Sequence, residues 1–141
     1  MSQENVENLR AFLETWSRTA WRTEPGRRWE PDLSLLDPDF TFEDTVLPDQ
    51  VGERYRGHEG FIRAGENWAE AYEWLLVELE QIIGARDHIV SIHRARSKAR
   101  HTGIESETPL AYVWTFQDGK IIHCRGFASP KKALEAAGLR E

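Results

Sequence analysis

The chain has 141 residues, a hydrophobic fraction of 40% and a formal net charge of −6. This length is typical of a single domain over residues 1–141, with enough apolar residues to form a core. The negative charge argues against binding to nucleic acid or to an anionic membrane, because both need basic patches.

The first half of the chain predicts two long helices with a strand between them. Apolar residues recur at helical spacing over residues 6–16 and again over residues 61–72. Between them, we expect a short helical turn over residues 32–36, stopped by Asp37-Pro38. The alternating segment Phe40-Thr-Phe-Glu-Asp44 then predicts a strand.

The second half predicts four strands and a last short helix. Strands are expected over residues 74–83 and 87–101, and a hairpin is expected within residues 108–127. Asp118-Gly119 between two apolar arms is a strong hairpin signal. Ser129-Pro130 is a suitable start for the final helix, with serine as the cap and proline in the first turn. Helices followed by meandering strands predict an α+β fold whose sheet curls around the helices.

The single cysteine, Cys124, excludes an internal disulfide and is typical of a reducing compartment. The first residues lack the basic and apolar regions of a signal peptide, and no apolar run is long enough to span a bilayer. We therefore expect a cytoplasmic protein with no membrane partner.

Four segments spread along the chain resemble the NTF2-like superfamily, in particular its SnoaL-like polyketide cyclase branch and the related ketosteroid isomerases. The resemblance covers nearly the whole chain. It implies a cone, in which a strongly curved antiparallel or mixed sheet wraps around the N-terminal helices and leaves an apolar pocket at the open end. Many members form homodimers through the outer sheet face. The matching segments are Phe40-Thr-Phe-Glu-Asp44, Tyr55-Arg-Gly-His-Glu-Gly-Phe-Ile62, Val113-Trp-Thr-Phe-Gln-Asp-Gly-Lys-Ile121 and Ala133-Leu-Glu-Ala-Ala-Gly-Leu139.

Asp44 is the first candidate catalytic residue. Strand parity places it on the same face as Phe40 and Phe42, and a carboxylate among aromatic rings has a raised pKa that suits a general base. The resemblance implies the same role, because Asp44 falls where ketosteroid isomerases have their proton-abstracting aspartate. The structural alternative is an aspartate that caps the following loop at the end of the strand.

Tyr112 is the second candidate. Ketosteroid isomerases stabilise the oxyanion with a tyrosine on the first helix and a protonated aspartate on a late strand. At the matching positions this chain has Ala11 or Phe12, and Tyr112. Steroid isomerisation is therefore not expected, whereas base-assisted chemistry on another carbonyl compound stays open, with Tyr112 as the hydrogen-bond donor. Alternatively, Tyr112 is an ordinary sheet aromatic whose hydroxyl reaches solvent.

The turn at Asp118-Gly119 decides which side chains face the pocket. A two-residue turn without a bulge would put His123 and Arg125 on the face of Tyr112. A three-residue turn with a bulge would instead put Cys124 there, and we favour it because it keeps charged side chains out of an aromatic cone.

The remaining candidates line the expected pocket or serve as core. We expect an interior wall formed by Phe12, Trp16, Phe42, Phe61, Trp68, Trp114 and Cys124. Arg94 is included as a residue of the pocket rim that could attract an anionic or carbonyl-rich ligand, although alternating basic residues on this strand are also typical of a solvated strand end. No histidine pair has metal-motif spacing, so neither a metal nor another cofactor is expected.

Together with these residues, the resemblance implies a protein that binds a small, largely apolar, oxygenated molecule in a cone-shaped pocket. If it is an enzyme, the expected chemistry is a cofactor-independent isomerisation, cyclisation or elimination with Asp44 as general acid and base. The alternative is a non-catalytic ligand-binding or dimerisation module of the same fold, since this fold hosts many functions.

Overall fold

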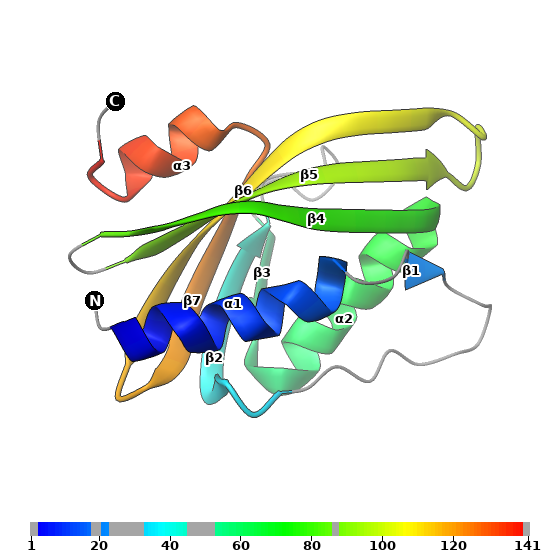
Figure 1. The fold of residues 1–141 in the computed structure, drawn as a ribbon. Coiled ribbons are helices and arrows are strands. Elements are labelled where there is room, and N and C mark those ends of the chain that lie inside the picture. Colours follow the sequence, from blue (N-terminus) through cyan, green and yellow to red (C-terminus); the bar gives the residue numbers. More distant parts are fainter. Residues whose placement is uncertain (1–2, 18–20, 23–32, 45–52, 86–87, 140–141) are drawn as a thin grey trace.

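The computed structural model describes residues 3–17, 21–22, 33–44, 53–85 and 88–139. These residues form three helices and one seven-stranded sheet (Figure 1). The helices are α1 (Gln3–Ser17), α2 (Gly57–Ala71) and α3 (Pro130–Ala136). The strands are β1 (Trp21–Arg22), β2 (Leu36–Asp44), β3 (Glu53–Arg56), β4 (Tyr72–Gly84), β5 (Ile89–Ala99), β6 (Glu105–Gln117) and β7 (Lys120–Phe127).

The sheet has the strand order β1-β4-β5-β6-β7-β2-β3. All neighbouring strands are antiparallel except β2 and β7, which run parallel. The sheet bends around α1 and α2, while α3 packs on its other face (Figure 1). This architecture confirms the predicted α+β cone with a curved, mixed sheet around the N-terminal helices.

Each face of the sheet has its own apolar core. The inner core joins α1 and α2 to the sheet through residues such as Leu13, Phe61 and Trp114. The outer core lies beneath α3 and includes Val113 and Leu134. Because neighbouring strand residues point to opposite faces, β6 supplies Tyr112 and Trp114 to the inner core and Val113 to the outer one. The predicted hairpin with its two apolar arms is thus covered on both faces of the sheet.

The predicted helical turn before Asp37-Pro38 is wrong at its C-terminal end. Strand β2 begins at Leu36, whose backbone pairs with Ile121 of β7. The amide of Ile121 also donates to the carbonyl of Leu35, so residues 35 and 36 are hydrogen-bonded to the sheet and do not continue a helical turn. The register shifts between Leu36 and Thr41, which accommodates the Asp-Pro pair as an irregularity in the strand.

Two glycines explain the start of α2. Gly57 has φ +71, a conformation that glycine adopts without strain, and it turns the chain from β3 into the helix. At Gly60, an added Cβ would lie 3.0 Å from the backbone carbon of Tyr55, so a side chain there would press on the backbone of β3. Between them, His58 Nε2 lies 2.9 Å from the carbonyl oxygen of Leu36 and ties α2 to β2. The matching segment over residues 55–62 therefore has a structural role, because it connects β3 to α2 and fixes α2 against β2.

The last helix begins as predicted. Ser129 is its N-cap, and its side-chain oxygen accepts a hydrogen bond from the amide of Lys132. Pro130 lies in the first turn, and Gly138 follows the helix with φ +79. Ala133 and Leu134 are buried against the outer face of the sheet.

Candidate functional site

Aromatic side chains from β2 and β6 meet on the inner face of the sheet. The Tyr112 ring lies 6.3 Å from the Phe42 ring and 5.6 Å from the Trp114 ring, measured between centroids. Cys124 is buried in the same cluster and is the direct cross-strand partner of both Phe42 and Trp114. Four residues predicted to line the site therefore lie together on one wall.

Asp44 belongs to the next row of this wall by backbone pairing. It is the last residue of β2 and pairs with Gly126 of β7, which in turn pairs with Tyr112 of β6. Strands are spaced about 4.8 Å apart, so the backbones of Asp44 and Tyr112 are separated by roughly 10 Å across a residue without a side chain. The side chain of Asp44 lies outside the described part of the structure.

The β6–β7 hairpin places Cys124 on the predicted inner face, but its turn differs from the one that we expected. Its turn has two residues, because Gln117 pairs with Lys120, and both Asp118 and Gly119 have positive φ angles of 52 and 78. This is the turn type that suits the twist of a hairpin. The register then shifts, since Phe116 pairs with Ile121 and Thr115 with His123.

The predicted three-residue turn was therefore wrong, but the predicted face of Cys124 was right. The extra residue is Ile122, inside β7 and beyond the turn. On the outer face, His123 Nδ1 lies 2.7 Å from Thr41 Oγ1, and Arg125 forms an ion pair with Glu43. Neither His123 nor Arg125 lies on the face of Tyr112.

The inner wall also contains a polar pair that the sequence analysis did not select. Ser91 and His93 lie two residues apart on β5, and both are fully buried. Ser91 Oγ accepts a hydrogen bond from Trp114 Nε1 at 2.8 Å and lies 2.8 Å from His93 Nε2. The imidazole stands edge-on to the Tyr112 ring at 5.4 Å between centroids.

The alternation of buried and exposed residues along β5 could have indicated this pair in the sequence. Arg94 and Arg96 mark the solvent face of the strand, so Ser91 and His93 must point inward. Burial lowers the pKa of His93 to about 3, because the apolar surroundings disfavour the charged ring. The imidazole is therefore neutral near pH 7 and can act both as donor and as acceptor.

The other predicted site residues divide into three groups. Phe12 and Phe61 are buried in the inner core, where their ring centroids lie 6.3 Å apart and Phe12 meets Trp114 edge-on at 6.2 Å. The side chains of Trp16 and Trp68 fall outside the described residues. Arg94 lies away from the cluster, on the outer face of the sheet.

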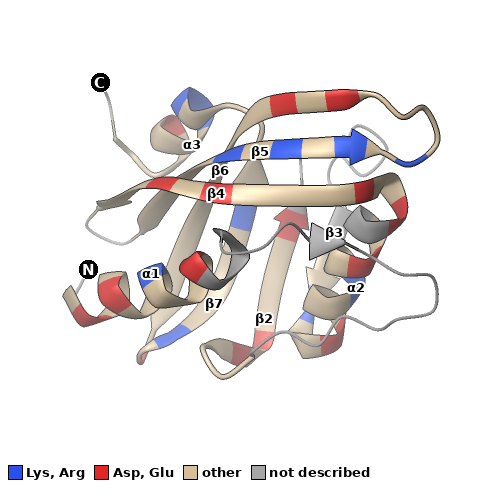
Figure 2. Cartoon of the chain, turned by 45° about the vertical axis from the view of Figure 1, so that its right-hand side comes forward, with Lys and Arg blue, Asp and Glu red and all other residues tan. Residues whose placement is uncertain are grey.

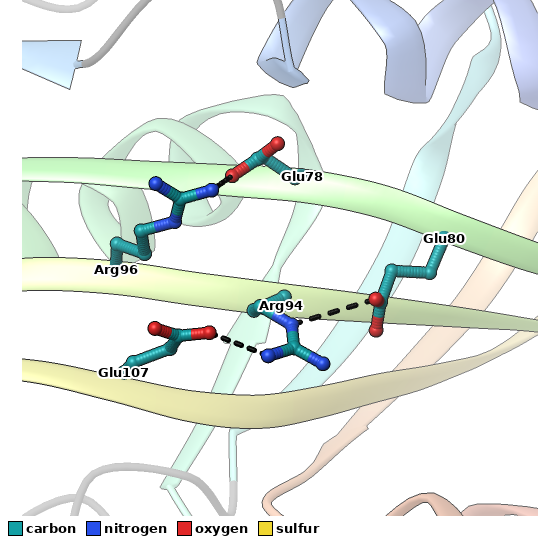
Figure 3. Close-up of polar contacts among 5 residues, drawn as sticks. All are labelled: Glu78, Glu80, Arg94, Arg96 and Glu107. Carbon is teal, nitrogen blue, oxygen red and sulfur yellow. Dashed lines mark hydrogen bonds and ion pairs between the residues drawn. The ribbon is translucent and has the colours of Figure 1, made fainter.

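Arg94 belongs to a strip of opposite charges over β4, β5 and β6, in which basic residues of β5 lie between acidic residues of its neighbours (Figure 2). Its guanidinium forms ion pairs with Glu107 on one side and Glu80 on the other, and Arg96 pairs with Glu78 at 2.6 Å (Figure 3). The hydrogen bond from Arg94 lowers the pKa of the Glu107 carboxyl. The expected position of Arg94 at a pocket rim is therefore wrong. Arg94 lies on the outer face of the sheet and is part of this charged strip.

Within the described ranges, no group of three His, Cys, Asp or Glu side chains is placed to hold a metal ion. No helix in the described part of the chain is both long and apolar enough to cross a bilayer.

The fold and the inner wall define an NTF2-like α+β cone, and comparison with known proteins agrees. The family model of the SnoaL-like domain matches residues 9–124. The chain therefore belongs to the SnoaL-like domain family. A comparison with curated protein sequences found no match.

Three solved structures share the fold at low sequence identity. An NTF2-like protein of unknown function from Burkholderia pseudomallei K96243 has a TM-score of 0.71 and 20% identity, over 97% of this chain and 98% of that one. A putative SnoaL-like polyketide cyclase from Jannaschia sp. CCS1 has a TM-score of 0.67 and 23% identity, over 97% and 94%. A protein with a ketosteroid isomerase-like fold from Catenulispora acidiphila DSM 44928, in complex with trimethylamine, has a TM-score of 0.67 and 17% identity, over 99% and 96%.

Proposed function

We propose that this SnoaL-like protein binds a small, largely apolar, oxygenated molecule against the inner wall of the cone and acts on it by acid-base chemistry. Asp44 is the general acid and base, and Tyr112 donates a hydrogen bond to the oxygen on which negative charge develops. Phe12, Phe42, Phe61, Trp114 and Cys124 supply the apolar contacts, together with Trp16 and Trp68.

The observation that carries this proposal is the row Asp44, Gly126, Tyr112 in the sheet register. It separates the proposed base from the proposed donor by two strand spacings, with only a glycine between them. The backbones are roughly 10 Å apart, and strand pairing places both side chains on the same face of the sheet.

The reaction follows from these two groups. The Asp44 carboxylate removes a proton from the carbon next to a carbonyl, and the electron pair moves to the carbonyl oxygen. Tyr112 stabilises that oxygen through its hydroxyl. Asp44 then returns the proton to another carbon for an isomerisation, or to a leaving oxygen for an elimination.

The test uses proton exchange, which needs no knowledge of the final product. Cyclic and aromatic ketones are incubated with the protein in deuterium oxide, and exchange at the α-carbon is followed by NMR. We expect Asp44→Asn to lower the exchange rate at least 100-fold on any ketone that the wild type exchanges. Glu43→Gln, the neighbouring outward carboxylate, is the matched control and keeps the wild-type rate. Equal rates in wild type and Asp44→Asn contradict the proposed base.

The second candidate function is non-catalytic binding on the same wall. It is supported by the absence of the first-helix tyrosine at Ala11 and Phe12 and of the second acid at Tyr112. In that case the same ketones raise the melting temperature of the wild type and of Asp44→Asn alike, without exchange.

We also propose that the protein is a cytoplasmic homodimer that associates through its outer sheet face. Helix α3 covers part of the outer side of β5, β6 and β7, whereas the charged strip of β4, β5 and β6 is exposed on the outer face and is accessible to a second copy (Figure 2).

A further inference from the structure

The packing of the core does not by itself explain why β5 has a buried histidine, His93, beside Ser91. Trp114 Nε1 needs an acceptor in this apolar setting, and Ser91 Oγ supplies it at 2.8 Å. His93 is not needed for that bond. A leucine or phenylalanine would fill the same space without the cost of burying an imidazole among aromatic rings.

The position of His93 relates it to the proposed chemistry. Ser91 is the direct cross-strand partner of Tyr112, and His93 lies diagonally beside it, opposite Leu110. The His93 ring meets the Tyr112 ring at 5.4 Å and an interplanar angle of 76°. The imidazole, the serine hydroxyl and the tyrosine therefore form one patch of the inner wall.

The charge of this patch restricts what it can bind. Among the described side chains that are buried, the polar ones are Ser91, His93 and Ser97, and none is charged near neutral pH. An anionic group placed here would lose its hydration without gaining a counter-charge, which is costly in an apolar site. A neutral imidazole can instead donate to a carbonyl oxygen or accept from a hydroxyl group.

We propose that Ser91 and His93 are the recognition pair of the inner wall and that they select an uncharged ligand whose carbonyl or hydroxyl oxygen hydrogen-bonds to the imidazole of His93. This inference rests on the proposed function, because it assumes that a ligand reaches the wall beside Tyr112. Ser91 is a positioning residue, since its hydroxyl holds Trp114 and the ring of His93 in place.

The test compares four naphthalenes of similar shape by equilibrium dialysis against the full-length protein. Naphthalene has no polar group, 2-naphthol is an uncharged oxygen compound, 2-naphthoate is an anion and 2-naphthylmethylammonium is a cation. In the wild type we expect 2-naphthol to bind roughly three- to ten-fold more tightly than naphthalene, as one hydrogen bond provides, and more tightly than either ion.

In His93→Phe this advantage of 2-naphthol should vanish while naphthalene binds as before. His88→Phe is the matched control, because His88 lies on the outer side of the sheet, where its Nδ1 is 3.0 Å from Thr115 Oγ1. The control keeps the preference for 2-naphthol. His93→Gln, which retains a polar side chain, should restore part of it.

Several outcomes overturn the inference. If His93→Phe keeps the preference, His93 does not recognise the oxygen. If 2-naphthoate or the ammonium compound binds most tightly, the selected ligand is not uncharged. If naphthalene binds but 2-naphthol gains nothing in the wild type, the recognition pair fails while the apolar site of the proposed function stands. If none of the four binds, both proposals fail.

A measurement on the wild type keeps the test independent of whether His93→Phe folds. Nitrogen-15 NMR of labelled histidine follows the imidazole directly. We expect 2-naphthol to shift the His93 ring nitrogens and naphthalene to leave them nearly unchanged. No shift with saturating 2-naphthol contradicts the inference.

Discussion

His93 shows how a single buried side chain makes stability depend on pH. The ring is completely buried and has a pKa of about 3, whereas a histidine in the unfolded chain has a pKa of 6.5. Well above pH 6.5 neither state binds the proton, and His93 leaves the free energy of unfolding unchanged. As the pH falls from 6.5 toward 3, only the unfolded chain binds it, so the folded state loses stability over that window.

We therefore expect His93 to lower the free energy of unfolding by about 2 kcal/mol between pH 6.5 and pH 5. Urea unfolding at the two pH values measures this change. His93→Gln removes the titrating group and should flatten the dependence by that amount. His101→Gln, at an exposed histidine, should leave the slope as it is in the wild type. Parallel slopes for wild type and His93→Gln contradict the burial argument.

At the scale of an element, the β6–β7 hairpin shows what the sequence could predict. Asp118-Gly119 between two apolar arms indicated the turn and the two strands. The pairing could not be derived, because it depends on the unpaired Ile122, which carries no local signal that distinguishes it from Ile121. The right face for Cys124 was reached because an aromatic wall excludes charged side chains such as Arg125.

The turn itself gives a prediction. Gly119 has φ +78, so Gly119→Ala forces a Cβ into a conformation that L-residues avoid and should cost about 1 kcal/mol of unfolding free energy. Asp118→Asn is the control, because asparagine tolerates the observed φ of 52 and should be close to neutral. Urea unfolding of both variants checks the difference. If Gly119→Ala leaves the free energy of unfolding unchanged, the loop does not adopt this turn.

The elements that escaped prediction are the ones held by distant partners. Strand β1 has two residues and exists by pairing with β4, and β3 has four residues and pairs with β2. The start of β2 at Leu36 likewise depends on β7. Local propensity predicted the helices and the long strands well because their own periodicity is strong, whereas the short edges depend on contacts far along the chain.

At the scale of the whole molecule, the charged strip limits how a second copy can bind. Its ion pairs are formed within one chain and are exposed, so each contributes little to folding. Their value for the proposed dimer is charge complementarity, because rows of alternating sign can face each other across a two-fold axis.

Arg96→Glu tests this interface. It places a third carboxylate beside Glu78 and opposite Glu107, so like charges accumulate on both copies. We expect light scattering to give twice the chain mass of 16.3 kDa for the wild type and a single chain mass for Arg96→Glu. Lys132→Glu on α3, an exposed residue outside the strip, should remain dimeric. A monomeric wild type contradicts the outer-face dimer.

The parallel pairing of β2 with β7 has a consequence for the order in which the chain folds. Strands β4 to β7 are consecutive antiparallel neighbours, so they can pair through short turns. Strands β1 and β2 attach to the two opposite edges of that meander, and neither can join it until β4 and β7 have left the ribosome. The apolar side of α1, with Leu9 and Leu13, must therefore wait for a surface made by residues synthesised much later. The N-terminal third of this protein is the part most exposed to premature association during synthesis.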